Sequence, residues 1–262
     1  MQESEGIAWG VADHIGRIML KRSARANALS RDASRALVRA IDEVLEARPR
    51  VVLLAAEGRI FCAGGDIDEF VAAGSALSAL VDDILEPLHP ALHRLASAPL
   101  PIVAALNGPV GGAGVGLALS ADFVLAARSM KLRTGYAAIG LSPDLGASYF
   151  LARRVGAVRA QQWLMLSEAV DAQRCLDSGA VDFVYPDAEL PDAAERLVQR
   201  LASSAAGSLA AIKRLCAGLP GRDLHAHLAL EHELLAACAH SADAREGVRA
   251  FVERREPRFG ND

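Results

Sequence analysis

Two glycine-rich segments constrain this chain more than any other feature. They are residues 60–67 (IFCAGGDI) and 107–116 (NGPVGGAGVG), and each follows a short apolar run typical of a buried strand. Small residues let a backbone come close to another group. Two such turns can direct two backbone N–H groups at one oxygen, an arrangement that stabilises an oxyanion in acyl chemistry.

Strands buried on both faces are predicted at short, continuous apolar runs. These runs fall at residues 51–56, 102–106 and 122–127. Segments with helical spacing separate them, and connections of this length indicate right-handed parallel units. We therefore expect an α/β core over residues 1–190, which begins with a hairpin formed by residues 6–11 and 15–20.

Helices are predicted where apolar residues recur at helical spacing. Ser30 is the expected N-cap of the first, and another is expected over residues 111–120. Between them, Pro87 and Pro90 are expected to kink or interrupt a helix over residues 77–98.

Residues 191–262 form a second predicted region, which has a helical pattern alone. Its helices are expected at residues 193–204, 209–217, 224–237 and 242–254. A small region cannot bury the apolar faces of these helices by itself. We therefore expect it to dock on the core and on a neighbouring subunit.

Composition excludes several classes of protein. A net charge of −4 over 262 residues gives no basic surface for nucleic acid. No apolar run reaches the ~18 residues that a membrane span requires, and the first five residues are unlike a signal peptide. The four cysteines, Cys62, Cys175, Cys216 and Cys238, fit neither a zinc nor a disulfide spacing. We expect a cytoplasmic protein with reduced cysteines.

Two histidines on a predicted helix raise the question of a metal site. His89 and His93 are four residues apart, a spacing that can bind a metal ion. No third ligand lies nearby in the sequence, and solvated helix faces explain these side chains better. We expect no metal.

The two glycine-rich segments, in this order, resemble the signature of the crotonase (enoyl-CoA hydratase/isomerase) superfamily. The resemblance covers nearly the whole chain, from residues 20–22 (LKR) and 27–29 (NAL) to 244–251 (AREGVRAF). It implies a ClpP/crotonase-like spiral core of ββα units with a C-terminal helical trimerisation region. It also implies an acyl-CoA substrate, with coenzyme A present only as part of the thioester, and a homotrimer or a dimer of trimers.

Matching positions place the family's two oxyanion donors on the N–H groups of Ala63 and Ala113. Many members have glycine at the second position, so the methyl group of Ala113 narrows the approach to the thioester oxygen. Alternatively, both turns only permit tight strand-to-helix packing. A dinucleotide-binding turn fits the second segment poorly, because the third glycine of G-x-G-x-x-G falls on Leu117.

This chain lacks acidic residues at the two positions where hydratases of this superfamily have their catalytic glutamates. Their two water-activating glutamates match Gly116 and Tyr136, so ordinary hydration of a 2-enoyl-CoA is not expected. Residues 139–146 (IGLSPDLG) instead resemble isomerase-type members similar to epoxyphenylacetyl-CoA isomerase, in which the aspartate shuttles a proton. The resemblance implies this role for Asp144. Alternatively, Asp144 caps the following helix, and Tyr136 either hydrogen bonds to substrate or only packs.

Coenzyme A is expected against the first turn, again from the resemblance. The residues expected to contact it mainly through backbone are Ala24, Ala63, Gly64, Asp66 and Ile67. Asp66 is expected to act mainly in the structure, by ordering the turn or capping the next helix.

Basic side chains are expected to meet the phosphates of the coenzyme. The candidates are Lys21, Arg22 and Arg25, although three charges in five residues could equally form a solvated loop. In the C-terminal region, Lys213 and Phe251 match segments that reach a neighbour's coenzyme.

The sequence thus predicts an acyl-CoA-processing enzyme that holds a thioester enolate between Ala63 and Ala113 and isomerises an enoyl-CoA through Asp144. Two alternatives stay open. One is a hydratase or dehydratase in which Asp144 alone activates water, and the other is a catalytically silent acyl-CoA-binding protein.

Overall fold

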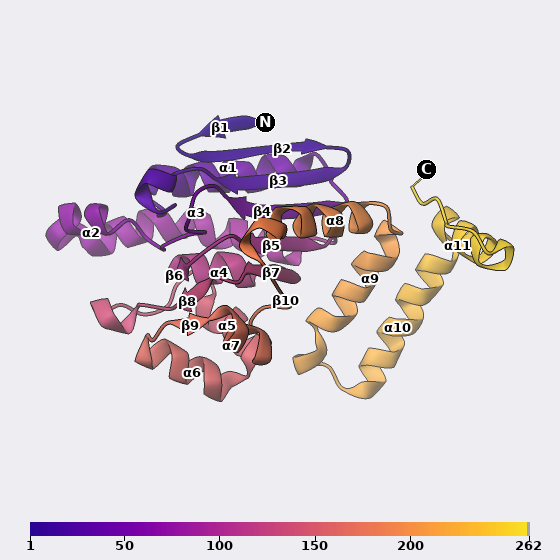
Figure 1. Ribbon diagram of the computed structural model, residues 1–262. Coiled ribbons are helices and arrows are strands. Elements are labelled where there is room, and N and C mark those ends of the chain that lie inside the picture. The colour runs from indigo at the N-terminus through magenta and orange to yellow at the C-terminus, as the bar shows by residue number, and fades with distance from the viewer. Residues whose placement is uncertain (261–262) are drawn as a thin grey trace.

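The computed structural model describes residues 1–260, which form two β-sheets and a series of helices (Figure 1). The strands are β1 (Gln2–Ser4), β2 (Ile7–Ala12), β3 (Ile15–Leu20), β4 (Val51–Ala56), β5 (Ile102–Leu106), β6 (Val110–Gly111), β7 (Phe123–Ala127), β8 (Lys131–Arg133), β9 (Val170–Asp171) and β10 (Phe183–Tyr185). The α-helices are α1 (Arg31–Glu46), α2 (Ile67–Ala73), α3 (Leu77–Ser97), α4 (Ala113–Leu119), α5 (Ala147–Val155), α6 (Ala157–Leu166), α7 (Ala172–Asp177), α8 (Leu190–Ala202), α9 (Ala206–Ala217), α10 (Leu224–Ala239) and α11 (Ala242–Glu253). Short 3-10 helices lie at Ser23–Arg25, Gly74–Ala76, Ala137–Ile139, Asp187–Glu189 and Leu219–Gly221.

The main sheet has the strand order β1-β2-β3-β4-β5-β7-β10. Strands β4, β5 and β7 are parallel, as predicted from the buried apolar runs. Strand β3 and strand β10, which was not predicted, extend this parallel part of the sheet. The predicted hairpin is also confirmed, with β2 and β3 antiparallel and joined through Asp13 and His14. Both residues have positive φ, 50° and 61°, the conformation of a tight two-residue turn. Strand β1, which was not predicted, pairs with the other edge of β2.

The main sheet is buried on both faces. In β4, Val52 and Leu54 belong to one hydrophobic cluster, whereas Val51 and Leu53 belong to a second. This alternation is the two-residue period of a strand covered on both sides. The first cluster includes residues of α1, α3 and α4, and the second is covered by α8. The predicted docking of the C-terminal region on the core is thus confirmed for α8.

Helix α3 is not interrupted by its two prolines, which corrects one of the two outcomes expected for them. Pro87 and Pro90 lie inside it, yet the helix runs without a break from Leu77 to Ser97. A proline in a helix costs ~3 kcal/mol because it removes a donor and crowds the preceding turn. Six side chains of α3 are buried at helical spacing: Leu80, Ile84, Leu88, Ala91, Leu92 and Leu95. Each such burial stabilises by about 1.5–3 kcal/mol, except for the smaller Ala91, so packing outweighs the two prolines.

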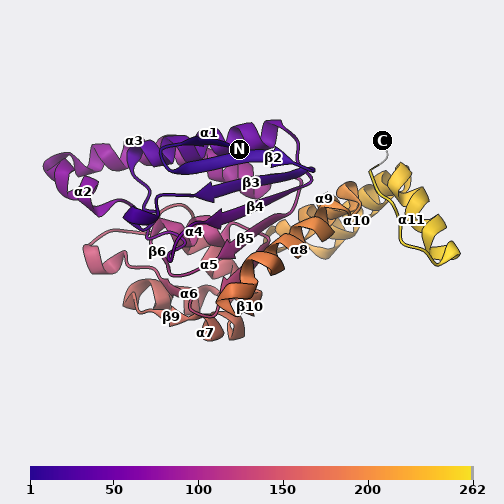
Figure 2. The ribbon, with the colours of Figure 1, turned by 45° about the horizontal axis from the view of Figure 1, so that its top comes forward.

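The last three helices extend away from the core as an arm, which both views of the ribbon show (Figures 1 and 2). The arm carries many of the exposed large apolar side chains: Ile212, Leu219, Leu224, Leu228, Leu235, Val248, Phe251 and Val252. No helix within residues 1–260 is both long and apolar enough to cross a membrane.

Candidate active site

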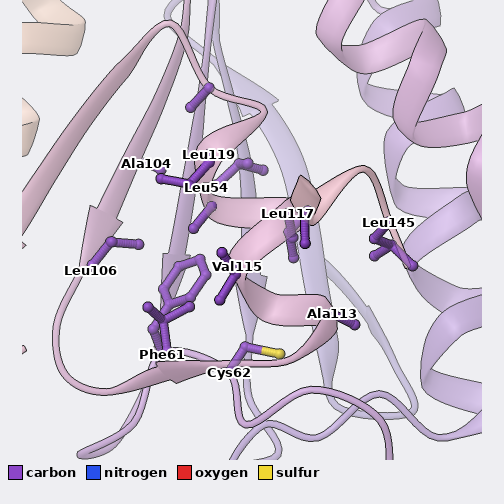
Figure 3. Packing of buried hydrophobic residues seen from close by; sticks show 14 of the residues in the cluster. Leu54, Phe61, Cys62, Ala104, Leu106, Ala113, Val115, Leu117, Leu119 and Leu145 are labelled. Atoms are coloured by element: carbon purple, nitrogen blue, oxygen red, sulfur yellow. The ribbon is translucent and has the colours of Figure 1, made fainter. Parts of the chain in front are cut away.

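The two glycine-rich turns lie against each other, backbone to backbone. Phe61 N–H donates to the Pro109 carbonyl (3.0 Å), and Gly111 N–H donates to the Cys62 carbonyl (2.8 Å). A Cβ atom on Gly64 would lie only 3.1 Å from the Gly111 carbonyl oxygen. In Figure 3, Cys62 lies at the foot of α4, close to Ala113 at the start of that helix. The small residues of both segments are therefore required by this close approach.

A cavity of about 620 Å³ opens beside the paired turns. Both turns line it together with Tyr136 and Asp144, and most of its lining is apolar. The apolar wall residues come from α2, α3 and residues 139–141, and they include Ile67, Phe70, Val81, Leu85, Ile139 and Leu141. A recess of about 30 Å³ is lined jointly by Gly65, Ala113 and Asp144.

The structure corrects the first predicted oxyanion donor. The N–H group of Ala63 donates a hydrogen bond to the Ala26 carbonyl (3.1 Å), so it is already satisfied within the protein. Although Ala63 lines the cavity, its N–H is not available to a substrate in this conformation.

Gly65, two residues further on, has the geometry that Ala63 lacks. Leu29 N–H donates to the Gly64 carbonyl (2.8 Å), and Asp66 N–H donates to the Leu29 carbonyl (3.2 Å). Because successive peptide groups of an extended chain alternate in direction, the Gly65 N–H points to the side opposite Leu29. Within the described part of the chain, neither the Gly65 N–H nor the Ala113 N–H has a hydrogen-bond partner.

The buried Tyr136 and the part-buried Asp144 form a pair in the cavity. The Tyr136 hydroxyl donates to Oδ1 of Asp144 at 2.5 Å. Burial raises the pKa of Asp144, while the Tyr136 hydrogen bond and the charge of His89 act in the opposite direction. Burial, followed by the Asp144 charge, also raises the pKa of Tyr136, so the phenol keeps its proton and remains a donor.

The alternative in which Asp144 caps the following helix is wrong. Gly146 is the N-cap of α5, and no side chain caps this helix. The carboxyl group of Asp144 is directed to Tyr136 instead, and only its backbone carbonyl accepts from Ala147 N–H (2.8 Å).

The two positions of the missing glutamates both contact this aspartate turn. Tyr136 is bonded to Asp144, and Gly116 is packed against the next residue. A Cβ atom on Gly116 would lie 2.1 Å from the Leu145 carbonyl oxygen. No side chain fits at residue 116 while the turn stays in place. The conformation of the Asp144 turn therefore requires a glycine at residue 116.

His89 is a site residue that the sequence did not reveal. Its side chain lies on the cavity wall, and its Nε2 accepts a hydrogen bond from Leu145 N–H (3.2 Å). His89 is exposed on α3, as expected for a solvated helix face, but it also has this contact inside the site, which was not predicted. The one feature of the sequence that could have indicated this position is the i, i+4 spacing of His89 to Leu85, which places both on the same face of the helix. Cys62 also lines the cavity, and burial raises the pKa of its thiol to about 12.

Asp66 caps the next helix, as expected. Its buried side chain accepts from Asp68 N–H (3.2 Å) and so caps α2. Arg22 and Arg25 approach the two carboxylate oxygens of Asp66 at 3.3 and 3.2 Å. Buried between two guanidinium groups, the carboxylate fixes the loop of residues 22–25 to the first turn.

The predicted coenzyme-binding cations are all paired with acids of this chain. Lys21 binds Glu3 (2.8 Å), and the half-exposed Arg25 also binds Asp68 (2.5 Å). In the C-terminal region, Lys213 binds Asp122 (2.7 Å) and the Leu100 carbonyl (2.9 Å), which fastens α9 to the core. Contacts of these cations with coenzyme phosphates stay predictions.

The other predicted coenzyme contacts differ in exposure. Ala24 and Phe251 are exposed, Phe251 by 86%, and Ile67 is half-exposed at the cavity. Gly64 is closed in by the second turn, as described above. Residues 1–260 contain no group of three His, Cys, Asp or Glu side chains that could hold a metal ion.

In this α/β core, two main-chain turns and a part-buried carboxyl group share one largely apolar cavity, an arrangement suited to enzyme chemistry. Residues 10–262 match the sequence profile of the enoyl-CoA hydratase/isomerase family. The chain therefore belongs to this family, the crotonase superfamily, and has the crotonase fold.

The relatives of this chain are named for both activities. The chain is 34% identical over 253 residues to a probable enoyl-CoA hydratase of Rhodobacter capsulatus, covering 97% of each protein. It is 36% identical over 211 residues to the 1,2-epoxyphenylacetyl-CoA isomerase of Escherichia coli, covering 80% of each. A solved structure of a putative enoyl-CoA hydratase from Streptomyces coelicolor A3(2) superposes with a TM-score of 0.92 at 31% identity, covering 100% of this chain and 96% of the other.

Proposed function

We propose that this protein isomerises enoyl-CoA thioesters by proton transfer through Asp144. The observation that carries the proposal is the shared recess of Gly65, Ala113 and Asp144. Gly65 and Ala113, whose N–H groups have no partner among residues 1–260, line it together with the part-buried Asp144. Two donors and one carboxyl group are the minimum that an enolate mechanism requires.

The thioester oxygen is held by the N–H groups of Gly65 and Ala113. The ionised carboxylate of Asp144 removes a proton from the carbon alpha or gamma to the thioester. The electron pair of that C–H bond moves into the enolate, and the two N–H donors stabilise the charge on oxygen. Asp144 then returns the same proton to the other carbon, so the double bond moves without a net change in atoms.

Burial of Asp144 makes it a better base, because a carboxyl group with a raised pKa binds a proton more strongly. Hydration by two carboxylates lacks support, since Asp144 is the only Asp or Glu that lines the cavity within residues 1–260. The apolar walls favour an acyl group of hydrocarbon character.

We place the coenzyme part of the substrate against the first turn, along residues 22–25 and 63–67. Arg25 is the candidate for a phosphate contact, because about half of its side chain is exposed there. The acyl part then points past Gly65 toward Asp144, since both residues line the cavity.

The test is to offer purified protein a 3-enoyl-CoA and a 2-enoyl-CoA and to follow the ultraviolet absorbance of the conjugated thioester. We expect isomerisation, with a loss of about 10²–10⁴-fold in kcat for Asp144→Asn. Asp177→Asn makes the same change on an exposed side chain of α7 and serves as the control. Hydration of the 2-enoyl thioester, or tight binding without turnover, would contradict the proposal.

A further inference from the structure

The turn that carries Asp144 is held from a separate element by His89. This histidine lies on α3, more than 50 residues earlier, and its Nε2 accepts from Leu145 N–H at 3.2 Å. Leu145 follows Asp144 directly and is 1% exposed. The bond therefore joins α3 to the backbone beside the proposed base.

The backbone at this turn needs such a restraint. Leu145 has a φ of +43°, a left-handed conformation that is unfavourable for a residue with a branched side chain. Strained residues persist only where the surroundings determine their conformation. Three contacts do so here: His89 on the Leu145 N–H, Gly116 against the Leu145 carbonyl, and Ala147 N–H on the Asp144 carbonyl.

We propose that His89 is a positioning residue that holds Asp144 in its working geometry, and that only the neutral imidazole can do so. The proposal rests on the isomerase function proposed above. A protonated imidazole has donors on both nitrogens and no acceptor, so it cannot receive the Leu145 N–H. Histidine is the side chain that commonly changes charge between about pH 5 and 8.

Other titratable groups surround His89 and belong to the same argument. They are Glu86 and His93 on its own helix, Tyr136 and Asp144 across the site cavity, and Arg153 on α5, which lines a larger cavity with His89. Protonation of His89 also stabilises the ionised form of Asp144. The two effects on activity have opposite signs. The positive charge favours ionised Asp144, whereas the loss of the hydrogen bond to Leu145 N–H releases the turn that positions Asp144.

The experiment compares His89→Gln, whose amide oxygen can accept the Leu145 N–H, with His89→Leu, which cannot. We expect His89→Leu to lower kcat about tenfold, as for one lost hydrogen bond, with KM changed less than twofold. His89→Gln should recover most of kcat. The ratio of wild-type to His89→Leu kcat should be larger at high pH, where a neutral imidazole accepts from Leu145 N–H, than at low pH, where a protonated one cannot. His93→Leu, on the same helix, is the control.

Amide hydrogen exchange at Leu145 separates this proposal from the proposed function. We expect faster exchange in His89→Leu than in His89→Gln or the wild type, whether or not any thioester is turned over. If the wild type turns over no enoyl-CoA but the exchange follows this order, the proposed function is wrong, while the positioning of the Leu145 turn by His89 is supported. Equal Leu145 exchange in all variants, or equal kcat and pH profiles, would overturn the role of His89.

Discussion

At the residue scale, the Tyr136–Asp144 pair should set the pH at which the proposed base, Asp144, is ionised. The Tyr136 hydrogen bond lowers the pKa of Asp144 against the effect of burial. Tyr136→Phe removes this bond, so the pKa of Asp144 should rise further and the carboxylate should form only at higher pH. We expect kcat/KM near neutral pH to fall about tenfold or more and to recover partly as the pH is raised.

A pH profile of kcat/KM measures this effect, with Tyr185→Phe as a matched change on β10. An acid limb that stays at the same pH in Tyr136→Phe would show that the phenol does not control the base.

The same carboxyl group should cost the protein stability. A pKa raised in the folded state means that the folded protein binds this proton more tightly than the unfolded chain does. The contribution of Asp144 to the free energy of unfolding is therefore most favourable at low pH. It falls as the pH rises from the ordinary pKa of 3.8 through the raised pKa of the folded state. Asp144→Asn removes this loss and can still accept the Tyr136 hydrogen bond.

We therefore expect Asp144→Asn to match the wild type in urea unfolding at low pH and to be more stable than it at neutral pH. An unchanged stability difference from pH 4 to pH 8 would contradict the burial of an ionising carboxyl group.

The residue scale is also where the sequence was least sufficient. Asp144 and Tyr136 were identified because their motif is contiguous or their position matches the family. The choice between Ala63 and Gly65 depends on the direction of each peptide group, which is set by the pairing of Gly64 and Asp66 with Leu29. That pairing joins residues more than 30 positions apart, and no local pattern shows it. The His89–Leu145 contact was hidden for the same reason.

At the element scale, the packing of α4 against the Asp144 turn gives a sharp test. In Gly116→Ala, the added Cβ would lie 2.1 Å from the Leu145 carbonyl oxygen and 2.7 Å from its carbon. Backbone atoms cannot rotate away as a side chain can, so either the turn or the helix must move. We expect a loss of about 1–3 kcal/mol in the free energy of unfolding, with a larger fractional loss of isomerase activity.

Gly207→Ala is the control, because a Cβ atom at residue 207 of α9 meets nothing within 4 Å. That variant should be as stable as the wild type or slightly more so, since alanine favours a helix by about 0.5–1 kcal/mol over glycine. Equal activity in Gly116→Ala and Gly207→Ala would show that the turn tolerates displacement.

Most elements were predictable because their signals are local. Ser30 caps α1, as expected, by accepting from Ala33 N–H, and the apolar runs became the parallel strands. The uninterrupted helix α3 was not predictable, since its prolines are local signals and the packing that outweighs them is not. The division of the chain at residue 190 stays a prediction, although α8 beyond it completes the second face of the sheet.

At the scale of the whole molecule, the arm of α9–α11 leaves a cavity of about 1380 Å³ between itself and the core. Polar atoms provide little of its lining, which includes Leu92, Phe150 and Val248. An apolar cavity of this size beside an arm of exposed apolar side chains is unfavourable for an isolated chain in water. The expected homotrimer or dimer of trimers would remove both surfaces from water.

Phe251→Asp tests the assembly. Phe251 is 86% exposed on α11, beside Val252 at 75%, so a charge there is harmless to a monomer and costly in an apolar interface. We expect the wild type to be oligomeric by light scattering and the variant to shift toward the monomer at the same concentration. Arg249→Asp is the control, because it introduces the same side chain at an exposed position that is already polar. It should shift the oligomer toward the monomer less than Phe251→Asp does. A wild type that is monomeric at micromolar concentration, or a Phe251→Asp protein of unchanged mass, would mean that the arm is covered in another way.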